Sequence, residues 1–382
     1  VYVDKTYNSN NKQIKNVVCM SYLTSFGYVL RDVIATSVVM YFGGYIDLIP
    51  NMIVRLIVSF VYCFVLGTVM MGMWVLAHEC GHQAFSPSLI VNDTVGCVLH
   101  TILLVPYWSW KYSHGQHHAN ANSMEKDSVF VPRTDLRIDF KRASEPSLLK
   151  RVTALVKFLT MGWILYLLIN AASSKVEKPA ANKKKGERGA VNTIAASLGL
   201  ETWNSHFNPF CNLWRNPGQR IGVVGSDVAL LVWVWILYRL ILRFGVITMT
   251  RNYFVPYIWV NVWLVIITYL QHTDLAVPKY YSEKWTWLRG ALGTVDRDFG
   301  IMNVLHHHIT DTHVLHHIFS QIPHYHAQEA TKALLDSHLI DEYYLCDPTP
   351  WYVALWRSYT QCWYVRHDQP ITWFESFKTK HF

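Results

Sequence analysis

Long apolar stretches constrain the folding of this 382-residue chain more than any other feature of its sequence. They lie at about residues 29–45, 52–77, 95–107, 153–171, 222–242 and 254–270. A helix needs roughly 20 apolar residues to cross a bilayer, and four or five of these stretches are long enough. The stretch 95–107 is too short to cross and contains His100, so we expect a re-entrant or interfacial segment there. The sequence therefore predicts an all-α protein that crosses a membrane several times.

The composition supports a membrane protein and argues against two other classes. Apolar residues make up 51% of the chain and charged residues 16%, and the 16 Trp and 22 Tyr exceed what a soluble core needs. These aromatic residues favour the bilayer interface. A net charge of +8 would also suit nucleic acid, but the longest basic run is only Lys183–Lys185, so no nucleic-acid partner is expected. Seven cysteines without a CxxC pair argue against a disulfide framework.

Three histidine clusters carry the chemistry of the chain. They are HECGH at 78–82, HGQHH at 114–118 and HVLHH at 313–317. Positions three and four apart share one face of a helix, so each cluster can direct its imidazoles to one point. Four nitrogens saturate a tetrahedral zinc, so eight indicate two metal ions that keep positions open for a small ligand. The predicted ligands are His78, His82, His114, His117, His118, His313, His316 and His317.

The three clusters can share a site only if they lie on one side of the membrane. Three apolar stretches separate the second cluster from the third, so one of these stretches cannot span. Basic loops flank 153–171 on both sides and should be cytosolic by the positive-inside rule, which predicts that 153–171 lies in the interface. Two transmembrane hairpins remain, 29–77 and 222–270. The predicted fold is therefore four spans with a cytosolic helical cap that holds a histidine-rich di-metal site, and both termini are cytosolic.

The flanking segments complete this organisation. We expect an N-terminal cytosolic segment at 1–28, a membrane-embedded domain at 29–340 and a C-terminal cytosolic tail at 341–382. The stretch 173–195 has low hydrophobicity and is expected to be a flexible basic loop. In the C-terminal sequence KTKHF, Lys378 and Lys380 have the spacing of a dilysine retrieval signal, for which a solvated basic tail is the alternative.

The first cluster also matches another signature. HECGH fits HExxH, in which two histidines bind zinc and the Glu is the general base of a metalloprotease. That assignment leaves two clusters unexplained, so an intramembrane zinc hydrolase or a metal transporter is only the alternative. Imidazole suits iron, copper and zinc alike. Because a metal pair beside apolar walls at the membrane face is well placed to activate oxygen against an acyl chain, redox iron matches best.

Around these clusters the chain resembles a known family. HECGHQAFS, HGQHH and HVLHH occur together with VFVP (129–132), ITYLQHT (267–273), WLRGALGTVDRDFG (287–300), ITDTH (309–313) and IPHYHAQEAT (322–331). Over about residues 70–340 the chain resembles the membrane-bound acyl-lipid fatty acid desaturases, and among them the delta-12 (oleate) branch. The resemblance implies a non-haem di-iron enzyme of the endoplasmic reticulum membrane that uses O2 and takes electrons from cytochrome b5 and its reductase. Its implied substrate is the oleoyl chain of a membrane phospholipid, from which it removes two hydrogens.

The resemblance also assigns roles to residues. The eight cluster histidines become iron ligands, and they act in catalysis through the bound irons. His272, in the QHT element, becomes a candidate ninth ligand. The neighbouring His306, His307 and His308 are not assigned to the metal.

Details of the motifs bear on the branch. Glu79 in the first cluster is typical of the delta-12 branch, whereas the omega-3 branch more often has Asp there. His313 replaces the Gln of front-end desaturases, and without an HPGG motif an external electron donor is implied. Gln83, Gly115 and Gln116 depart from the usual plant residues and favour a fungal or protist-like member. Divergent relatives use the same ligands, so an omega-3 desaturase, hydroxylase, epoxygenase or acetylenase remains an alternative.

Residues outside the clusters complete the predicted site. The carboxylates Glu79, Asp127, Asp311 and Glu329 are expected to orient ligand imidazoles by accepting their second N–H, with surface or capping acids as the alternative. The isolated His100, His206, His338 and His367 are expected to be ordinary core histidines.

Overall fold

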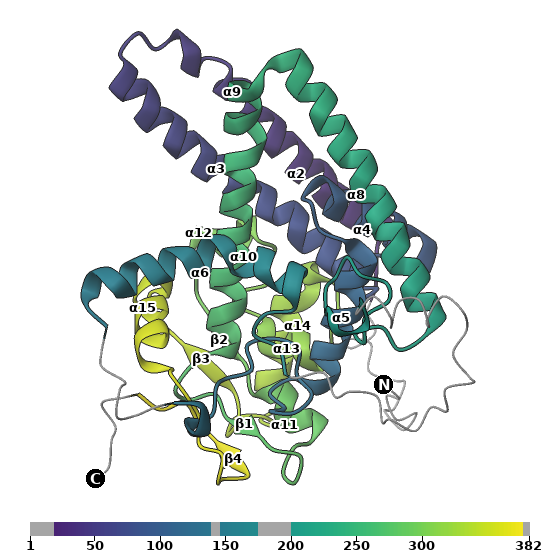
Figure 1. Ribbon diagram of the computed structural model, residues 1–382. Coiled ribbons are helices and arrows are strands. Elements are labelled where there is room, and N and C mark those ends of the chain that lie inside the picture. The colour runs from purple at the N-terminus through teal and green to yellow at the C-terminus, as the bar shows by residue number, and fades with distance from the viewer. Residues whose placement is uncertain (1–18, 139–145, 175–199, 377–382) are drawn as a thin grey trace.

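The computed structural model describes residues 19–138, 146–174 and 200–376, and this part of the chain is mostly helical (Figure 1). Its long helices are α2 (Tyr22–Gly43), α3 (Met52–Gly81), α6 (Leu148–Ile169), α8 (Pro217–Phe244) and α10 (Val255–His272). The short helix α9 (Val246–Met249) and a π-helical turn (Thr250–Phe254) lead directly into α10. Most of the basic loop at 173–195, and both Lys378 and Lys380, lie outside the described residues.

Shorter elements surround the lower ends of the long helices (Figure 1). The helices are α4 (Leu89–Ile102), α5 (Tyr107–Asn120), α11 (Trp287–Leu292), α12 (Ile301–Leu305), α13 (His313–Ile318), α14 (His324–Asp336) and α15 (Trp351–Gln361), with 3-10 turns at Ile46–Leu48, Asp135–Arg137 and Leu200–Thr202. The strands are β1 (Lys279–Tyr280), β2 (Val295–Arg297), β3 (Leu345–Asp347) and β4 (Ile371–Thr372). The strand β1 pairs antiparallel with β4, and β2 pairs parallel with β3.

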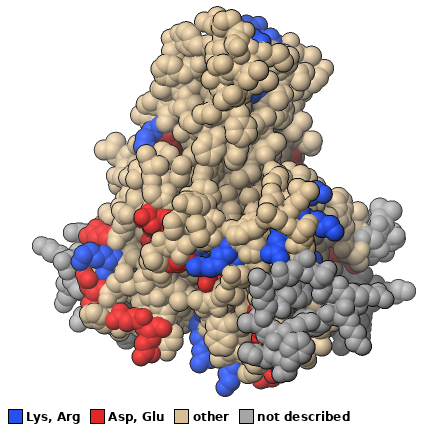
Figure 2. Space-filling model, turned by 90° about the vertical axis from the view of Figure 1, so that its left-hand side faces the viewer, with Lys and Arg blue, Asp and Glu red and all other residues tan. Residues whose placement is uncertain are grey.

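Several helical segments are suited to a bilayer. In the described part of the chain, five are long and apolar enough to span: Tyr22–Leu48, Met52–Gly81, Leu148–Ile169, Pro217–Phe244 and Val246–His272. Their surfaces expose large apolar side chains such as Leu23 (87%) and Ile247 (83%), which suits contact with lipid rather than water. Figure 2 shows an upper region that is almost free of charged residues, with most acidic and basic side chains gathered below it. The prediction of a helical multi-pass membrane protein is confirmed.

The helix α6 bears on the number of spans. The sequence predicts that 153–171 lies in the interface and leaves four spans, yet α6 is long and apolar enough to be a fifth candidate. Figure 1 shows α6 lying across α10 rather than alongside the upright helices. Length and composition therefore give five candidates, and only the orientation of α6 distinguishes it from the other four.

The predicted short segment at 95–107 forms part of a bent pair of helices. The helices α4 and α5 meet at an angle of 107°, as in a broken span or a re-entrant loop. Ser88 begins α4 by accepting a hydrogen bond from the backbone N–H of Val91. Because of the bend, α5 and the second histidine cluster lie below the upright helices, beside the end of α3 (Figure 1).

The core of the molecule lies where α3 packs against α10. A side chain at Gly67 would place its Cβ 2.4 Å from Cβ of Trp259 and 2.6 Å from the carbonyl oxygen of Pro256, so only glycine allows this approach. One residue further on, Thr68 accepts a hydrogen bond from the indole N–H of Trp263 at 2.8 Å. This close contact fixes the two helices whose lower ends reach the histidine clusters.

Candidate metal centre

Four helices bring the predicted ligands to one place. The first cluster lies at the end of α3, whose last turn contains His78 and whose next residue is His82. The helix α5 carries the second cluster, α13 carries the third, and α10 ends at the QHT element. The residues gathered there are His78, His82, His114, His117, His118, His272, His313, His316 and His317.

The ring nitrogens form two neighbouring sets. One set contains His78, His82, His114, His118 and His316, and the other contains His117, His272 and His317; the ligand atoms of each set lie within 4.8 Å of one another. His313 adjoins the second set, because its Nε2 is 3.1 Å from Nε2 of His272. Two adjacent sets of imidazoles are what two metal ions require.

The rings have the chemistry of a metal site. Nε2 of His78 lies 2.9 Å from Nε2 of His114, and within the described residues both ring nitrogens of His317 are buried without a hydrogen-bond partner. Burial lowers the pKa of His316 to about 3, so this imidazole is neutral and keeps a lone pair for a metal. A cluster of buried neutral imidazoles that face one another fits the ligation of metal ions, because buried polar groups in an ordinary core pair with donors or acceptors of the protein instead.

Two of the predicted carboxylates adjoin predicted ligands. The Asp127 side chain accepts a hydrogen bond from Nδ1 of His117 at 2.7 Å and another from the backbone N–H of Asn122 at 2.7 Å. This contact fixes the imidazole with its Nε2 directed toward the cluster. Glu79 is buried too, and its Oε1 lies 3.5 Å from Nδ1 of His78.

The other two predicted carboxylates lie away from the ligands. Asp311 is 3.0 Å from Nδ1 of His308, and the exposed Glu329 is 3.8 Å from Nδ1 of His326. For both residues the alternative of an ordinary local acid is the one that the structure supports.

The unassigned histidines after α12 have protein partners. Nε2 of His306 faces the backbone carbonyl of Thr68 at 3.2 Å, and Nε2 of His307 pairs with the buried Asp32 at 2.7 Å. These contacts join the segment before α13 to α2 and α3. They agree with leaving both residues out of the ligand set.

The isolated histidines divide into two kinds. His100 and His206 are buried as predicted. The prediction is wrong for His338 and His367, which lie at the surface and pair with aspartates at 2.7 and 2.8 Å. His338 lies in a turn after α14 and His367 in a bend after α15, where no helical or strand periodicity separates exposed from buried positions.

Sequence reasoning missed an aromatic wall beside the cluster. The ring of Trp110 stacks on His114 with a centroid distance of 4.7 Å, and Trp74 stacks on His78 at 5.8 Å. Both tryptophans are buried. The spacing of four residues between each Trp and its His was the available signal, since such positions share a helical face.

A buried cation that holds the end of α10 was also missed. Lys279 donates to the backbone carbonyl of His272 at 3.1 Å and to Oδ1 of Asn122 at 2.7 Å. Burial lowers the pKa of Lys279 to about 8, which leaves a positive charge at neutral pH beside the negative end of the helix. Arg297 donates to the carbonyl of Leu270 at 3.0 Å and supports the same end.

The fold and the centre together define a multi-pass membrane protein with a histidine-rich site suited to two metal ions. Residues 56–346 match the fatty acid desaturase family. The chain belongs to this family.

Similar proteins come from plants. The chain is 42% identical over 351 residues to the delta(12)-acyl-lipid-desaturase of Punica granatum, and 41% identical over 349 residues to an omega-6 fatty acid desaturase, endoplasmic reticulum isozyme 1, of Glycine max. It is 39% identical over 355 residues to the oleoyl-12-hydroxylase of Ricinus communis. Each comparison covers 91% of this chain and 83% of the relative.

These relatives do not support the prediction of a fungal or protist-like member. That prediction depended on Gln83, Gly115 and Gln116, which lie within or directly beside two short motifs. Identity across most of the chain carries more weight than three positions, and it points to plant sequences.

Proposed function

We propose that this protein is a delta-12 desaturase that converts oleoyl groups of membrane phospholipids into linoleoyl groups. The observation that carries the proposal is the pair of imidazole sets at the lower ends of apolar helices, in a chain about 41% identical to proteins named delta-12 or omega-6 desaturases. In each turnover, two adjacent carbons each lose one hydrogen and become doubly bonded. O2 accepts these hydrogens together with two electrons and two protons, and two waters form.

The residues of the centre have distinct parts in this chemistry. The nine histidines would hold two non-haem irons, which supply the oxidising power that an unactivated C–H bond requires. Asp127 keeps the proton of His117 at Nδ1, so that Nε2 is free to bind. Trp74 and Trp110 cover one side of the imidazoles and exclude water from it.

The position of the new double bond depends on how the acyl chain is held. Neighbouring methylene groups are chemically almost alike, so a desaturase selects one pair by placing it against the metals. The close contact of α3 with α10 at Gly67 holds together two helices that carry candidate ligands at their lower ends, which supports such fixed placement.

We propose cytochrome b5 and its reductase as the source of the two electrons that each turnover needs, on the strength of the membership in the fatty acid desaturase family. We place the enzyme in the endoplasmic reticulum membrane with four spans, with the clusters and both termini in the cytosol and α6 in the interface. The proposed membrane-embedded domain is 29–340, between cytosolic segments 1–28 and 341–382. Labelling of single introduced cysteines by a membrane-impermeant thiol reagent tests this topology: both ends of α6 should react from the same side.

The activity is tested by expression in a host that makes oleate but no linoleate. Gas chromatography of the host lipids should show a delta-12 diene. A second candidate is hydroxylation, because the oleoyl-12-hydroxylase relative is only slightly less similar than the desaturases. A hydroxy fatty acid in place of the diene would establish that candidate and overturn desaturation.

The ligand set is tested by a pair of histidine variants. His316→Ala should abolish the product and lower the iron content, whereas His326→Ala should change neither, because His326 faces Glu329 outside the cluster. Full activity and full iron content in His316→Ala would refute the assignment. One zinc per chain together with activity in the absence of oxygen would instead support a zinc hydrolase.

A further inference from the structure

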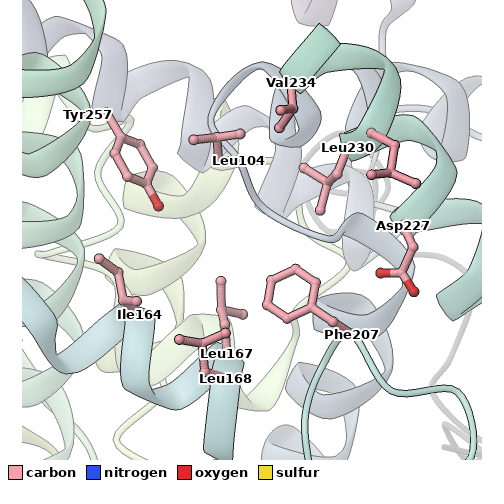
Figure 3. Close-up of a pocket in the computed structure, with 10 residues that line it drawn as sticks. Leu104, Ile164, Leu167, Leu168, Phe207, Asp227, Leu230, Val234 and Tyr257 are labelled. Atoms are coloured by element: carbon pink, nitrogen blue, oxygen red, sulfur yellow. The ribbon is translucent and has the colours of Figure 1, made fainter. Parts of the chain in front are cut away.

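A pocket separate from the imidazole cluster opens between α8 and α10 (Figure 3). Its volume is about 440 Å³, within the range of ligand sites. Ile164 and Leu167 of α6 lie on one side, Leu230 and Val234 of α8 on another, and Tyr257 of α10 opposite α8. Almost all of the lining is aliphatic or aromatic, so the pocket is suited to a hydrocarbon chain.

The pocket faces the bilayer. From α9, the helices α8 and α10 diverge, and α6 crosses below the gap between them (Figure 1). Leu231 and Val234, which line the pocket, are 69% and 51% exposed on a helix that is a candidate span. An acyl chain of a membrane lipid can therefore enter the pocket sideways, without passing through water.

The side of the pocket toward the imidazoles is closed. Leu167 lines the pocket and is only 3% exposed, and the neighbouring Trp163 is 7% exposed. Trp163 packs edge-on against Trp74 at a centroid distance of 6.2 Å, and Trp74 in turn stacks on His78. Along this path from α6 to the cluster, packed rings rather than open space join the two sites.

One carboxyl group lies in the apolar wall. Asp227 of α8 lines the pocket across from Tyr257 (Figure 3), and its Oδ1 is buried without a hydrogen-bond partner among the described residues. A buried polar atom without a partner in the protein is a sign of an external one. An isolated charge is costly in such surroundings, and a neutral carboxyl donates a hydrogen bond, which an ester carbonyl accepts.

A basic residue lies on the same side of α8, closer to its beginning. Arg220 is seven residues before Asp227, which is two helical turns or about 10 Å along the axis. Its guanidinium donates to the carbonyls of Pro209 at 2.8 Å and Trp214 at 3.5 Å, and the rest of its five N–H donors can bind an anion. A glycerophospholipid has its groups in the matching order: phosphate, ester, then hydrocarbon chain.

We propose that this pocket binds one acyl chain of a membrane glycerophospholipid, with an ester carbonyl at Asp227 and the phosphate toward Arg220. The proposal goes beyond the proposed desaturation, since this lipid is bound as a fixed part of the structure and not as the chain that reacts. The bound lipid fills the gap between α8 and α10 and completes the packing of α6 against them.

The test uses the full-length protein in nanodiscs that contain phosphatidylcholine with a photoreactive diazirine in one acyl chain. After irradiation, mass spectrometry of peptides should find label on the α6 segment 164–168 and on α8 near Leu230. Leu231→Trp places a bulky ring in the pocket and should reduce labelling of 164–168 about tenfold. This is the loss of affinity expected when the acyl chain gives up part of its apolar contact with the pocket. Val232→Trp is the matched control, because Val232 is 53% exposed and does not line the pocket.

A second variant and competition by other lipids distinguish between the possible ligands. Asp227→Leu should reduce labelling about fivefold, as expected for the loss of one hydrogen bond. Unlabelled phosphatidylcholine should compete better than diacylglycerol or a sterol. Equal labelling in both tryptophan variants, or a photoreactive sterol that labels 164–168 in preference to the phospholipid, would overturn the proposal. Labelling requires no turnover, so this result is independent of which acyl product the enzyme makes.

Discussion

Replacing Asp127 by Asn tests how far one buried carboxylate supports the metal centre. Asp127 accepts hydrogen bonds on both oxygens, from His117 and the backbone N–H of Val129 on Oδ1 and from the backbone N–H of Asn122 on Oδ2. An amide of the same shape has only one accepting oxygen, so its NH2 group must face a donor on one of these sides. The variant therefore loses a hydrogen bond in either orientation, while the volume of the side chain is kept.

The size of the effect follows from the charge on this contact. A hydrogen bond to a charged group contributes about 1.5–3 kcal/mol, and tenfold in affinity corresponds to about 1.4 kcal/mol. We therefore expect Asp127→Asn to lower iron affinity by about 10- to 100-fold, as is typical when a group that orients a ligand histidine is replaced. The assay is competition with a graded series of iron chelators, followed by metal analysis of the purified protein.

The surface offers a matched control for this variant. Asp341 pairs with Nδ1 of His338 at 2.7 Å, the same distance as between Asp127 and His117. The side chains of both Asp341 and His338 are exposed, however. Asp341→Asn should leave iron retention unchanged. If Asp127→Asn also retained iron as the unmodified protein does, while His117→Ala lost it, the orienting role of the carboxylate would be refuted.

Three further predictions concern packing and ligands. Gly67→Ala should prevent α3 from reaching α10 and sharply lower the yield of folded protein, whereas Gly27→Ala, with open space around it, should express normally; equal yields would contradict the packing argument. Asp32→Asn should lower the free energy of unfolding by about 1–3 kcal/mol, because it weakens the buried pair of Asp32 with His307. A thermal melt should show this as a lower melting temperature. Its iron content should stay constant, and a parallel loss of iron would show a direct metal role. His118→Ala should lose iron, and retention of both irons would exclude it as a ligand.

The site was more predictable from the sequence than the fold around it. Spacings of three and four residues identified eight of the nine clustered histidines, because a helix places such positions on one face. The ninth, His272, has no histidine three or four positions away, and only the resemblance singled it out. It reaches the cluster because α10 ends at that residue, which is a property of how α10 packs.

Contacts between distant segments were beyond sequence reasoning. His307 meets Asp32, which is 275 residues earlier in the chain, and no local pattern links the two. The same holds for Lys279, whose amine closes the end of α10 from a strand that follows a loop. For α6, composition indicates affinity for the membrane but not direction, so the question of a span or an interfacial helix depended on the charges of its neighbours.

The length of α3 ties the centre to the lipid around it. With 30 residues this helix is about 45 Å long, whereas the hydrocarbon core of a bilayer is about 30 Å thick, and its last turn carries His78. A helix longer than the membrane accommodates a change in bilayer thickness by tilting. Because His316 stands on a different and much shorter helix, a tilt of α3 that α13 does not follow changes the spacing between the two imidazoles. Membrane thickness is thereby a mechanical input to the geometry of the centre, and the lipid that the enzyme modifies is also part of the frame that holds its ligands in place.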